Sequence, residues 1–543
     1  MTSMKVADFF CGAGGFSEGF RQKGFKIAFA LDNWRPAIET HRFNHGEGCI
    51  HSDKNILDIA PQEIDDIIPD TEVIIGSPPC VAFSGSNKAG KADKSLGLSL
   101  IHKYLQIIAH KKNKKDSILK YWILENVPNS QRYIKEKYTF KELGLEGGDR
   151  IALLIKRNQL FNAADYGAPQ TRTRMLCGDF PEPTKLFEDP KQWVTLGAVI
   201  SSLEANNTKD GFIDVNYGFT IPKEHLTDHF YDTTVDEFEW RKAMSLKQDH
   251  SFMGKMSFPE DESRPSRTIM ATMSSSTREA MIIGSRRKPN TIYRRPTIRE
   301  IATIMSFPIT YQFIGNSEAT KYKLVGNAVC SKLAAAVAEA IISEKGLRPK
   351  YEPNPHVPFK APPFDLNGRK REPKDMKPKR LQSKFRAHVP FIKIRSFRAD
   401  LDNLSSDFQS ERFVWKSMLH YGTGKNAKSS HVSTQAIEKT MVLVTGFNEF
   451  KKDVERSFLG SLPNPKAFQM SYCKLTNGDT ISPEKALDMA KSLVDKHFPE
   501  ASSLRKEVNN SLIKIGSNSI PLRVLAACYA CNIISETVMS TGC

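Results

Sequence analysis

The first 180 residues alternate short apolar runs with segments whose apolar positions recur at helical spacing. The apolar runs predict four β-strands, at Lys5–Phe10, Lys26–Leu31, Val73–Gly76 and Tyr121–Leu124. Amphipathic segments between them, such as Trp34–Asn44 and Leu100–His110, predict helices. This alternation predicts an α/β fold with a doubly wound, mostly parallel sheet between helices. Ligands bind such sheets beyond the carboxyl ends of the strands.

The pattern changes character after residue 180. Residues 181–290 are polar, irregular and rich in turns, which favours a small recognition domain of strands and loops. The helical pattern returns in residues 291–346, where Ala334–Ser343 predicts a helix that packs on the first domain. The segment 291–346 is therefore expected to complete the domain formed by residues 1–180.

The last third of the chain begins with a predicted linker. Residues 347–400 are rich in proline and basic residues, a composition that favours an unfolded connection. Residues 401–543 have a globular composition again and predict an accessory domain, with a strand at Met441–Val444 and a helix at Pro521–Ile534.

Composition narrows the class of protein. The 543 residues suffice for two to four domains, and 78 Lys and Arg against 61 Asp and Glu give a net charge of +17, which favours a polyanionic partner. No apolar run approaches the length of a membrane span, and the N-terminus lacks a signal-peptide pattern. The nine cysteines are too sparse for a disulfide framework. We expect Cys528 and Cys531 to pack in the core, and we predict no metal site.

A glycine-rich turn follows the first predicted strand, in the sequence DFFCGAGGF. Gly12 and Gly14 allow a tight turn and a close approach to a ligand, and Asp32, which ends the next predicted strand, can hold ribose hydroxyls. The spacing differs from GxGxxG and no P-loop lysine follows, so a nucleoside without a pyrophosphate is the favoured ligand.

Two further motifs place reactive side chains at the same sheet edge. Cys80, in GSPPC, follows the strand Val73–Gly76 and is held by two prolines, which makes it a candidate nucleophile. Glu125, in ENV, follows the strand Tyr121–Leu124, where it can donate or shuttle a proton or can simply cap a helix.

The run QTRTR predicts a strand with Gln170, Arg172 and Arg174 on one face. Two arginines on one face suit a phosphate or a base carbonyl, and a solvated strand is an equally good interpretation. The motif GNAV, at residues 326–329, precedes the last predicted helix of this region.

In this order and spacing, these motifs resemble those of the DNA (cytosine-5) methyltransferases. The resemblance covers residues 4–345 and includes the segment RPTIREIATIMSF at Arg295–Phe307. It implies a Rossmann-like class I methyltransferase fold, with the target-recognition region between QTRTR and RRPTIRE. It also implies that S-adenosylmethionine is the cofactor and that the flipped-out cytosine belongs to double-stranded DNA.

The resemblance implies a role for each motif. Cys80 would attack C6 of cytosine, and Glu125 would act at N3. Arg174 would contact O2, with Arg172 as a neighbouring positive charge. The implied cofactor-binding residues are Phe10, Gly12, Gly14, Asp32, Asn33, Asn55, Pro79, Leu100, Asn327 and Val329.

Two positions depart from the family pattern. Asn55 stands where an aspartate commonly contacts the adenine amino group, although its carbonyl can still accept a hydrogen bond. Val81 stands where a glutamine commonly follows the nucleophile, which removes a polar contact near the flipped base.

Several alternatives stay open. The same core would serve a transfer-RNA cytosine-5 methyltransferase or a catalytically silent DNA-binding scaffold. In the accessory domain, Glu449-Phe450-Lys451 matches half of a nuclease site, and Tyr421–Lys425 lacks P-loop spacing. The favoured prediction is a prokaryotic, cytoplasmic enzyme that acts as a monomer on DNA. It would serve as an orphan enzyme or beside a separate restriction endonuclease.

Overall fold

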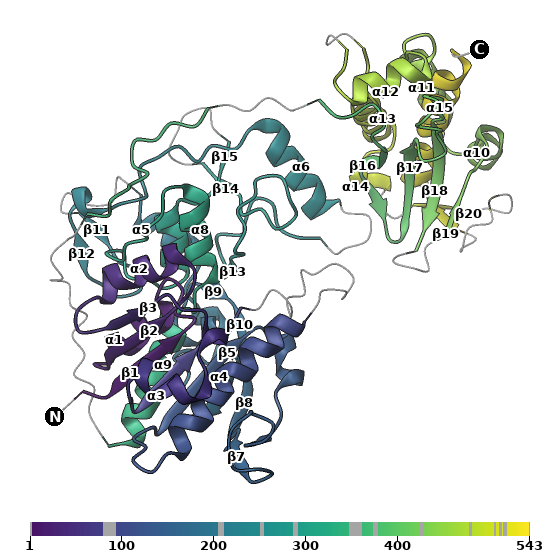
Figure 1. The fold of residues 1–543 in the computed structure, drawn as a ribbon. Coiled ribbons are helices and arrows are strands. Elements are labelled where there is room, and N and C mark those ends of the chain that lie inside the picture. The colour runs from purple at the N-terminus through teal and green to yellow at the C-terminus, as the bar shows by residue number, and fades with distance from the viewer. Residues whose placement is uncertain are drawn as a thin grey trace. The chain divides into compact units, whose positions relative to one another are not determined.

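The chain forms two compact units in the computed structural model, which are described separately (Figure 1). The N-terminal unit comprises 1–235, 259–275 and 279–372, and the C-terminal unit comprises 236–258, 276–278 and 373–543. The structure describes residues 3–79, 94–204, 211–249, 255–285, 292–346, 361–372, 378–422, 428–476, 480–503, 506–509, 513 and 519–541.

A seven-stranded sheet with the order β3-β2-β1-β4-β5-β10-β8 forms the centre of the N-terminal unit. Neighbouring strands from β3 to β5 are parallel, and β10 is antiparallel to both β5 and β8. The predicted doubly wound, Rossmann-like α/β fold is therefore confirmed, and so are the four predicted strands. The strands are β1 (Lys5–Phe9), β2 (Lys26–Leu31), β3 (Ile50–Ser52), β4 (Val73–Gly76), β5 (Tyr121–Asn126), β8 (Arg157–Asn162) and β10 (Thr173–Asp179).

Helices cover both faces of this sheet (Figure 1). Because neighbouring residues of a strand point to opposite faces, Val6 packs in a core with α1 and α9, whereas Ala7 packs in a second core with α4. Gly19 lets α1 and α9 approach closely, since an added Cβ there would lie 2.4 Å from the Cβ of Ala334. The helices are α1 (Gly15–Gln22), α2 (Arg35–His45), α3 (Ile64–Ile67), α4 (Ser95–Asn113), α7 (Ile298–Ile304), α8 (Glu318–Asn327) and α9 (Ser331–Glu344).

The predicted recognition region consists of short elements joined by irregular chain. Most of it belongs to the N-terminal unit, but α6 (Glu237–Gln248) groups with the C-terminal unit, which the sequence pattern did not indicate. The remaining short elements of the N-terminal unit are η1 (Ile56–Asp58), η2 (Pro61–Glu63), η4 (Pro128–Tyr133), β6 (Lys137–Thr139), β7 (Ile151–Leu154), η5 (Ala163–Tyr166), β9 (Gln170–Thr171), η6 (Pro190–Gln192), α5 (Leu196–Ser202), β11 (Phe212–Ile213), β12 (Thr220–Ile221), η7 (Lys223–His225), β13 (Ser266–Arg267), β14 (Ile283–Gly284) and β15 (Tyr293–Arg294).

The C-terminal unit contains a four-stranded antiparallel sheet that packs against helices. Its long helix α15 confirms the predicted helix and buries Cys528 and Cys531 completely, as expected for packing residues. The elements are β16 (Arg386–Ile394), β17 (Phe397–Asp402), β18 (Lys416–Tyr421), β19 (Lys428–Ser430), α10 (Thr434–Met441), α11 (Phe447–Phe458), α12 (Pro465–Tyr472), α13 (Pro483–His497), α14 (Glu500–Ser503), β20 (Glu507–Asn509), β21 (Ser519–Pro521) and α15 (Leu522–Ser540).

Two predictions in this part of the chain are wrong. Strands β16 and β17 occupy the end of the predicted linker, and Pro390 is tolerated because the β16 register shifts between His388 and Lys393. The predicted strand Met441–Val444 is instead the end of α10 and a turn, with Leu443 94% exposed. A four-residue apolar run is too short to separate a strand from a helix end.

The nuclease-like run also has a different setting from the one expected. Glu449 and Lys451 lie on helix α11, and Lys451 pairs with Glu438 at 2.6 Å. The strand that would present these side chains to a metal is therefore replaced by a helix. Of the run Tyr421–Lys425, the last three residues lie outside the described residues.

Residues 361–372, also within the predicted linker, pack on the N-terminal unit. The Asn367 Oδ1 accepts hydrogen bonds from the backbone N–H groups of His229 and Phe230, each at 2.8 Å. The Asn367 Nδ2 donates to the carbonyl of Leu226, also at 2.8 Å. One side chain thus satisfies three backbone groups of the recognition region.

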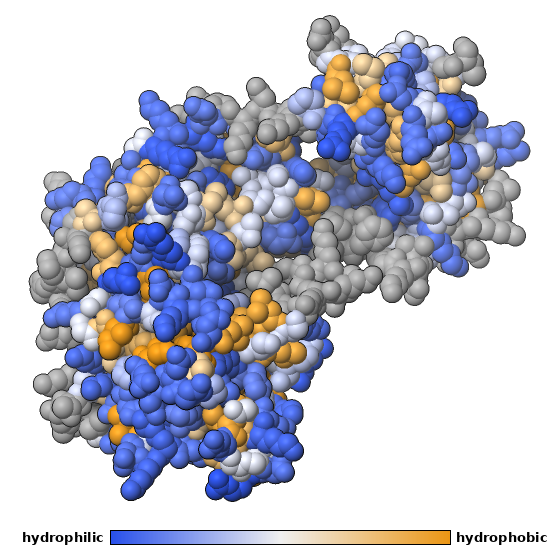
Figure 2. Space-filling model, in the orientation of Figure 1, coloured by the Kyte–Doolittle hydropathy of each residue, from blue (hydrophilic) through white to orange (hydrophobic). Residues whose placement is uncertain are grey.

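Two segments are long and apolar enough to cross a membrane by length and composition, which the sequence analysis did not anticipate. They are residues 318–344 and 522–540, and 72% and 89% of their apolar windows are buried in the fold. Such burial is typical of core helices of a globular protein. The surface seen in Figure 2 is mostly hydrophilic on both units, with apolar side chains in scattered groups.

Replacement of Asn367 by alanine tests the attachment of this segment. Asn367→Ala leaves two N–H groups without their acceptor, so we expect it to lower the free energy of unfolding by about 2–4 kcal/mol. Lys370→Ala, at an exposed position of the same segment, is the matched control and should change it by less than about 0.5 kcal/mol. Equal denaturant midpoints for both variants would show that the segment is not anchored in this way.

Candidate active site

Strands β1, β2 and β4 end at residues that pair with one another, and β5 runs two residues further. Phe9 of β1 pairs with Gly76 of β4, and Gly76 pairs with Leu124 of β5. On the other side, Phe9 pairs with Leu31 of β2. The chain segments that follow these four strands therefore leave the sheet from the same edge, as the sequence predicted.

Asp32 holds the glycine-rich turn in place. Its Oδ2 accepts a hydrogen bond from the Gly12 N–H at 2.9 Å, and its Oδ1 accepts from the Trp34 N–H at 2.8 Å. The Cys11 N–H donates to the carbonyl of Leu31 at 3.1 Å. Burial raises the pKa of Asp32 above its ordinary value. Each carboxylate oxygen keeps further accepting capacity, which leaves Asp32 able to bind a ligand hydroxyl.

The two glycines of this turn differ in what an added side chain would contact. Gly14 has φ of 89°, and an added Cβ would lie 2.4 Å from the Tyr311 hydroxyl. Gly12 has φ of 54°, and its added Cβ would meet nothing closer than 3.9 Å. The space in front of Gly12 is therefore open to a ligand, whereas Gly14 is required for internal packing. Phe10 also adopts a positive φ of 54°, which is uncommon for a non-glycine residue.

Glu125 is almost fully buried at the end of β5 and has two polar partners. The Ser77 hydroxyl donates to its Oε2 at 2.5 Å, and the Arg174 Nε lies 3.1 Å from its Oε1. Glu125 and Arg174, predicted from separate motifs, are thus in direct contact. Ser77 was missed as a site residue, although it stands inside the quoted motif GSPPC.

The loop that carries the candidate nucleophile is anchored at its start. The Ser77 N–H donates to the carbonyl of Phe9 at 3.1 Å, and the Asn126 Nδ2 donates to the carbonyl of Pro78 at 3.1 Å. Pro79 is exposed at the end of this stretch. Cys80 and Val81 lie outside the described residues.

Arg172 has a setting that the strand pattern did not reveal. The run QTRTR is divided between β9 and β10, and Arg172 lies at the break. Its guanidinium donates to the carbonyls of Ile269, Gly326 and Ala328 at 3.1, 3.2 and 3.2 Å. Arg172 therefore fixes the GNAV turn against the sheet, whereas Arg174 faces Glu125. Gln170 is fully buried, and its Nε2 contacts the Met305 Sδ at 3.3 Å.

The other predicted cofactor residues are distributed around the same edge. The carbonyl of Val329 lies against Gly15, where an added Cβ would approach it to 2.2 Å. Asn55 caps η1, and its Oδ1 accepts from the Leu57 N–H at 3.2 Å. The exposure of the remaining residues differs: Leu100 is buried on α4, while Asn33 and Asn327 are exposed.

Comparison with known proteins identifies the family. Residues 4–343 match the family described as C-5 cytosine-specific DNA methylase. The chain belongs to this family. It is 29% identical over 354 residues to the type II methyltransferase M.MthTI of Methanothermobacter thermautotrophicus, a match that covers 62% of this chain and 97% of that relative.

A second relative and one solved structure are also similar to parts of this chain. The type II methyltransferase M.FnuDI of Fusobacterium nucleatum is also 29% identical over 354 residues, covering 62% of this chain and 94% of its own. A solved structure of the Entamoeba histolytica methyltransferase EhMeth covers 64% of this chain and 99% of its own, at 16% identity and a TM-score of 0.40. The C-terminal unit lies largely beyond the family match.

The two glycines of the turn give a paired prediction about stability. Gly14→Ala forces a contact with Tyr311 in addition to backbone strain, and we expect a loss of about 3–5 kcal/mol in the free energy of unfolding. Gly12→Ala adds only the strain, about 1–2 kcal/mol. Denaturant unfolding of both variants measures the difference, and a Gly12→Ala variant as unstable as Gly14→Ala would contradict the proposed division of roles.

Proposed function

We propose that this methylase transfers a methyl group from S-adenosylmethionine to C5 of cytosine in a specific sequence of duplex DNA. The observation that carries the proposal is the buried contact of Glu125 with Ser77 and Arg174, at the start of the loop that bears Cys80. A carboxyl group and a cation at the start of that loop support a role for both at the substrate base. The type II methyltransferases among the relatives favour a modification enzyme, working with a separate restriction endonuclease or alone.

The residues at the glycine-rich turn fit S-adenosylmethionine. The open space at Gly12 admits a ligand close to the backbone, and Asp32 retains accepting capacity for ribose hydroxyls. The nucleoside end of the site would be completed by Phe10, Asn33, Leu100 and Asn55, the last of which stands where the family commonly has an aspartate. The remainder of the cofactor site would be supported by Gly14, Pro79, Asn327 and Val329. When bound, the cofactor supplies the electrophilic methyl group that C5 takes up.

The chain's own residues would activate the base. The Cys80 thiolate adds to C6 of the flipped-out cytosine, which raises the electron density at C5. Glu125 holds a proton at N3 and so favours that addition. Ser77 orients the carboxyl group, and Arg174 reaches O2 from its position beside it. After C5 has taken up the methyl group, a water molecule accepts the C5 proton, the C5–C6 double bond re-forms, and the C6–S bond breaks to release the Cys80 thiolate. The N3 proton returns to Glu125.

We propose that Arg172 is a positioning residue of this site. It adds positive charge near Arg174, while its contacts with the carbonyls of Gly326 and Ala328 hold the turn that contains Asn327. A lysine could not make this planar set of three contacts. Substitution of Arg172 would therefore disturb both the base site and the methionine end of the cofactor site.

Duplex DNA is the favoured substrate because of the net charge of +17 and the additional C-terminal unit. We further propose that the protein is cytoplasmic and acts as a monomer on DNA. Transfer RNA is the competing substrate for the same chemistry, and a silent DNA-binding scaffold is the competing function.

Methyl transfer distinguishes these functions. Labelled S-adenosylmethionine is incubated with the full chain and with duplex DNA or transfer RNA, and the product bases are analysed. We expect 5-methylcytosine in DNA, at a defined sequence. Label in RNA alone would overturn the substrate, and no label in either would favour the scaffold.

Replacement of Glu125 tests its role as a proton donor. Glu125→Gln keeps the shape of the side chain but removes its exchangeable carboxyl proton, so we expect kcat/KM to fall by about 100-fold or more. Glu188→Gln, at a side chain that is 82% exposed, is the matched control. Unchanged kcat/KM in Glu125→Gln would exclude this role.

Replacement of the nucleophile has a sharper expected result. Cys80→Ala should abolish methyl transfer and leave S-adenosylmethionine binding intact, because the thiol forms the covalent bond and the cofactor is held by other residues. Cys473→Ala controls for the loss of a cysteine elsewhere in the chain. Methyl transfer retained by Cys80→Ala would rule out the covalent mechanism.

A further inference from the structure

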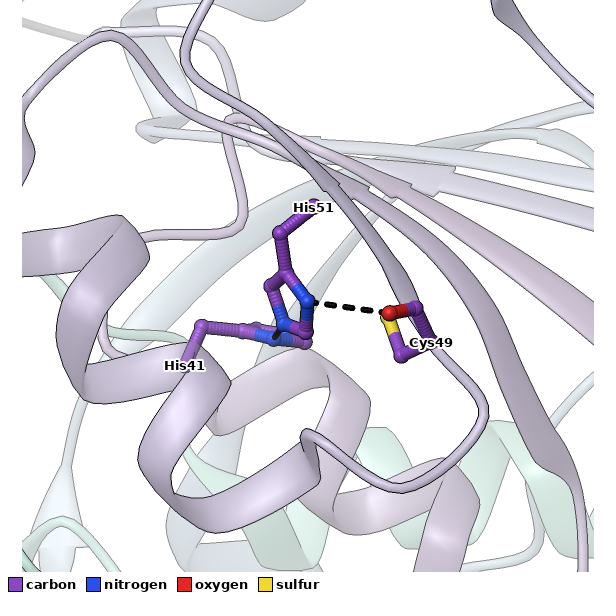
Figure 3. Close-up of side chains that lie close together, drawn as sticks. All are labelled: His41, Cys49 and His51. Carbon is purple, nitrogen blue, oxygen red and sulfur yellow. Dashed lines mark hydrogen bonds between the residues drawn. The ribbon is translucent and has the colours of Figure 1, made fainter.

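Three side chains that the candidate active site does not use converge beside the edge strand β3. His41 lies on α2, Cys49 precedes β3, and His51 lies on β3. One imidazole nitrogen from each histidine and the Cys49 Sγ all lie within 4.8 Å of one another. Figure 3 shows the two imidazole rings next to each other and steeply inclined, with Cys49 beside them.

The hydrogen bond of His51 fixes the form of its ring. Its Nδ1 lies 3.1 Å from the backbone carbonyl oxygen of Cys49 (Figure 3). Because a carbonyl oxygen can only accept, Nδ1 donates this hydrogen bond. In a neutral ring, Nε2 of His51 then carries a lone pair.

The form of the His41 ring follows from the charge of Asp8. With an ionised Asp8, the Ser17 hydroxyl donates to the Asp8 Oδ2 at 2.7 Å, and its oxygen accepts from the His41 Nε2 at 2.9 Å. A neutral His41 therefore carries its lone pair on Nδ1. That nitrogen lies 2.9 Å from the His51 Nε2. Two lone pairs thus face one another, and a cation between them would satisfy both.

The hydrogen bonds of the two rings leave one nitrogen of each to a cation, His41 Nδ1 and His51 Nε2. Neutral imidazoles are metal ligands. A metal ion accepts both lone pairs and leaves the outward N–H donors of the two rings undisturbed.

We propose that His41, Cys49 and His51 bind one divalent transition-metal ion, with Zn²⁺ preferred and a water molecule as the fourth ligand. Two imidazole nitrogens and a thiolate are a donor set that suits zinc. In a tetrahedral site the nitrogens would lie about 3.3 Å apart, so the rings need to separate by only a few tenths of an ångström. The Cys49 thiol releases its proton to solvent as the metal binds, because the thiolate is the form that ligates zinc.

The surroundings already resemble the outer contacts of a zinc site. Metal-bound histidines commonly donate their other N–H to a carbonyl or carboxylate, which fixes the ring. Here His51 donates to the Cys49 carbonyl, and His41 reaches the Asp8 carboxylate through Ser17. His51 and Cys49 are partly exposed, so an ion can enter.

The bound metal would stabilise the residues that hold the glycine-rich turn in place. Asp8 immediately precedes that turn on β1, and the carbonyl of Ser52, next to His51, accepts from the Asp32 N–H at 3.1 Å. The expected role is therefore structural. The sequence analysis predicts no metal site and did not consider these three residues, whose spacing, His-x7-Cys-x-His, matches no familiar zinc motif.

Metal content tests the site directly. The full chain is treated with a chelator, dialysed against metal-free buffer, and titrated with Zn²⁺ or Co²⁺. We expect one retained Zn²⁺ per chain by elemental analysis, a thiolate-to-Co²⁺ charge-transfer band, and a higher Tm with Zn²⁺.

Substitutions of the proposed ligands show whether this cluster binds the metal ion. Cys49→Ala should remove the charge-transfer band and, like His51→Gln, weaken Zn²⁺ binding at least about tenfold. Cys473→Ala and His102→Ala are the matched controls and should leave both unchanged. Circular dichroism confirms that each variant is folded. Wild-type chain without stoichiometric Zn²⁺, or a band that survives in Cys49→Ala, would overturn the proposal.

Discussion

The candidate active site depends on the register of the parallel strands. Phe9 and Gly76, the last residues of β1 and β4, pair with each other, and Gly76 pairs with Leu124, two residues before the end of β5. Hydrogen bonds extend this alignment beyond the sheet, from the Ser77 N–H to the carbonyl of Phe9 and from the Asn126 side chain to the carbonyl of Pro78. A shift of one residue between β4 and β5 would separate Glu125 from Ser77.

Arginine side chains join the later part of the chain to this edge. Arg172 binds main-chain carbonyls from residues that are 97 to 156 positions further along the sequence. Arg174, two residues on, instead faces the carboxyl group of Glu125. Two arginines of one motif thus have different contacts: Arg172 holds main-chain carbonyls, whereas Arg174 contacts a carboxyl group.

The sequence predicted the N-terminal unit well because its signals were local and repeated. Apolar runs with turns on both sides set β1, β2, β4 and β5, and the order of the motifs led to the family. The resemblance to the family implied that Glu125 and Arg174 act on the same cytosine, but their direct contact was not predicted.

Tertiary context decided what the sequence did not reveal. Residues 361–372 look like linker, yet Asn367 finds three backbone partners on the N-terminal unit. Helix α6 lies within the expected recognition region but groups with the C-terminal unit. Ser77, Arg172 and the cluster of His41, Cys49 and His51 depend on pairings between elements, which no spacing rule encodes.

Covalent trapping tests the central claim most directly. Duplex DNA of mixed sequence is prepared with 5-fluorocytosine in place of cytosine, and it is incubated with the full chain and S-adenosylmethionine. Because fluorine cannot leave C5 as a proton does, the adduct should persist, and mass spectrometry of the digested complex should locate the DNA on Cys80. No adduct, or an adduct on another residue, would contradict the account.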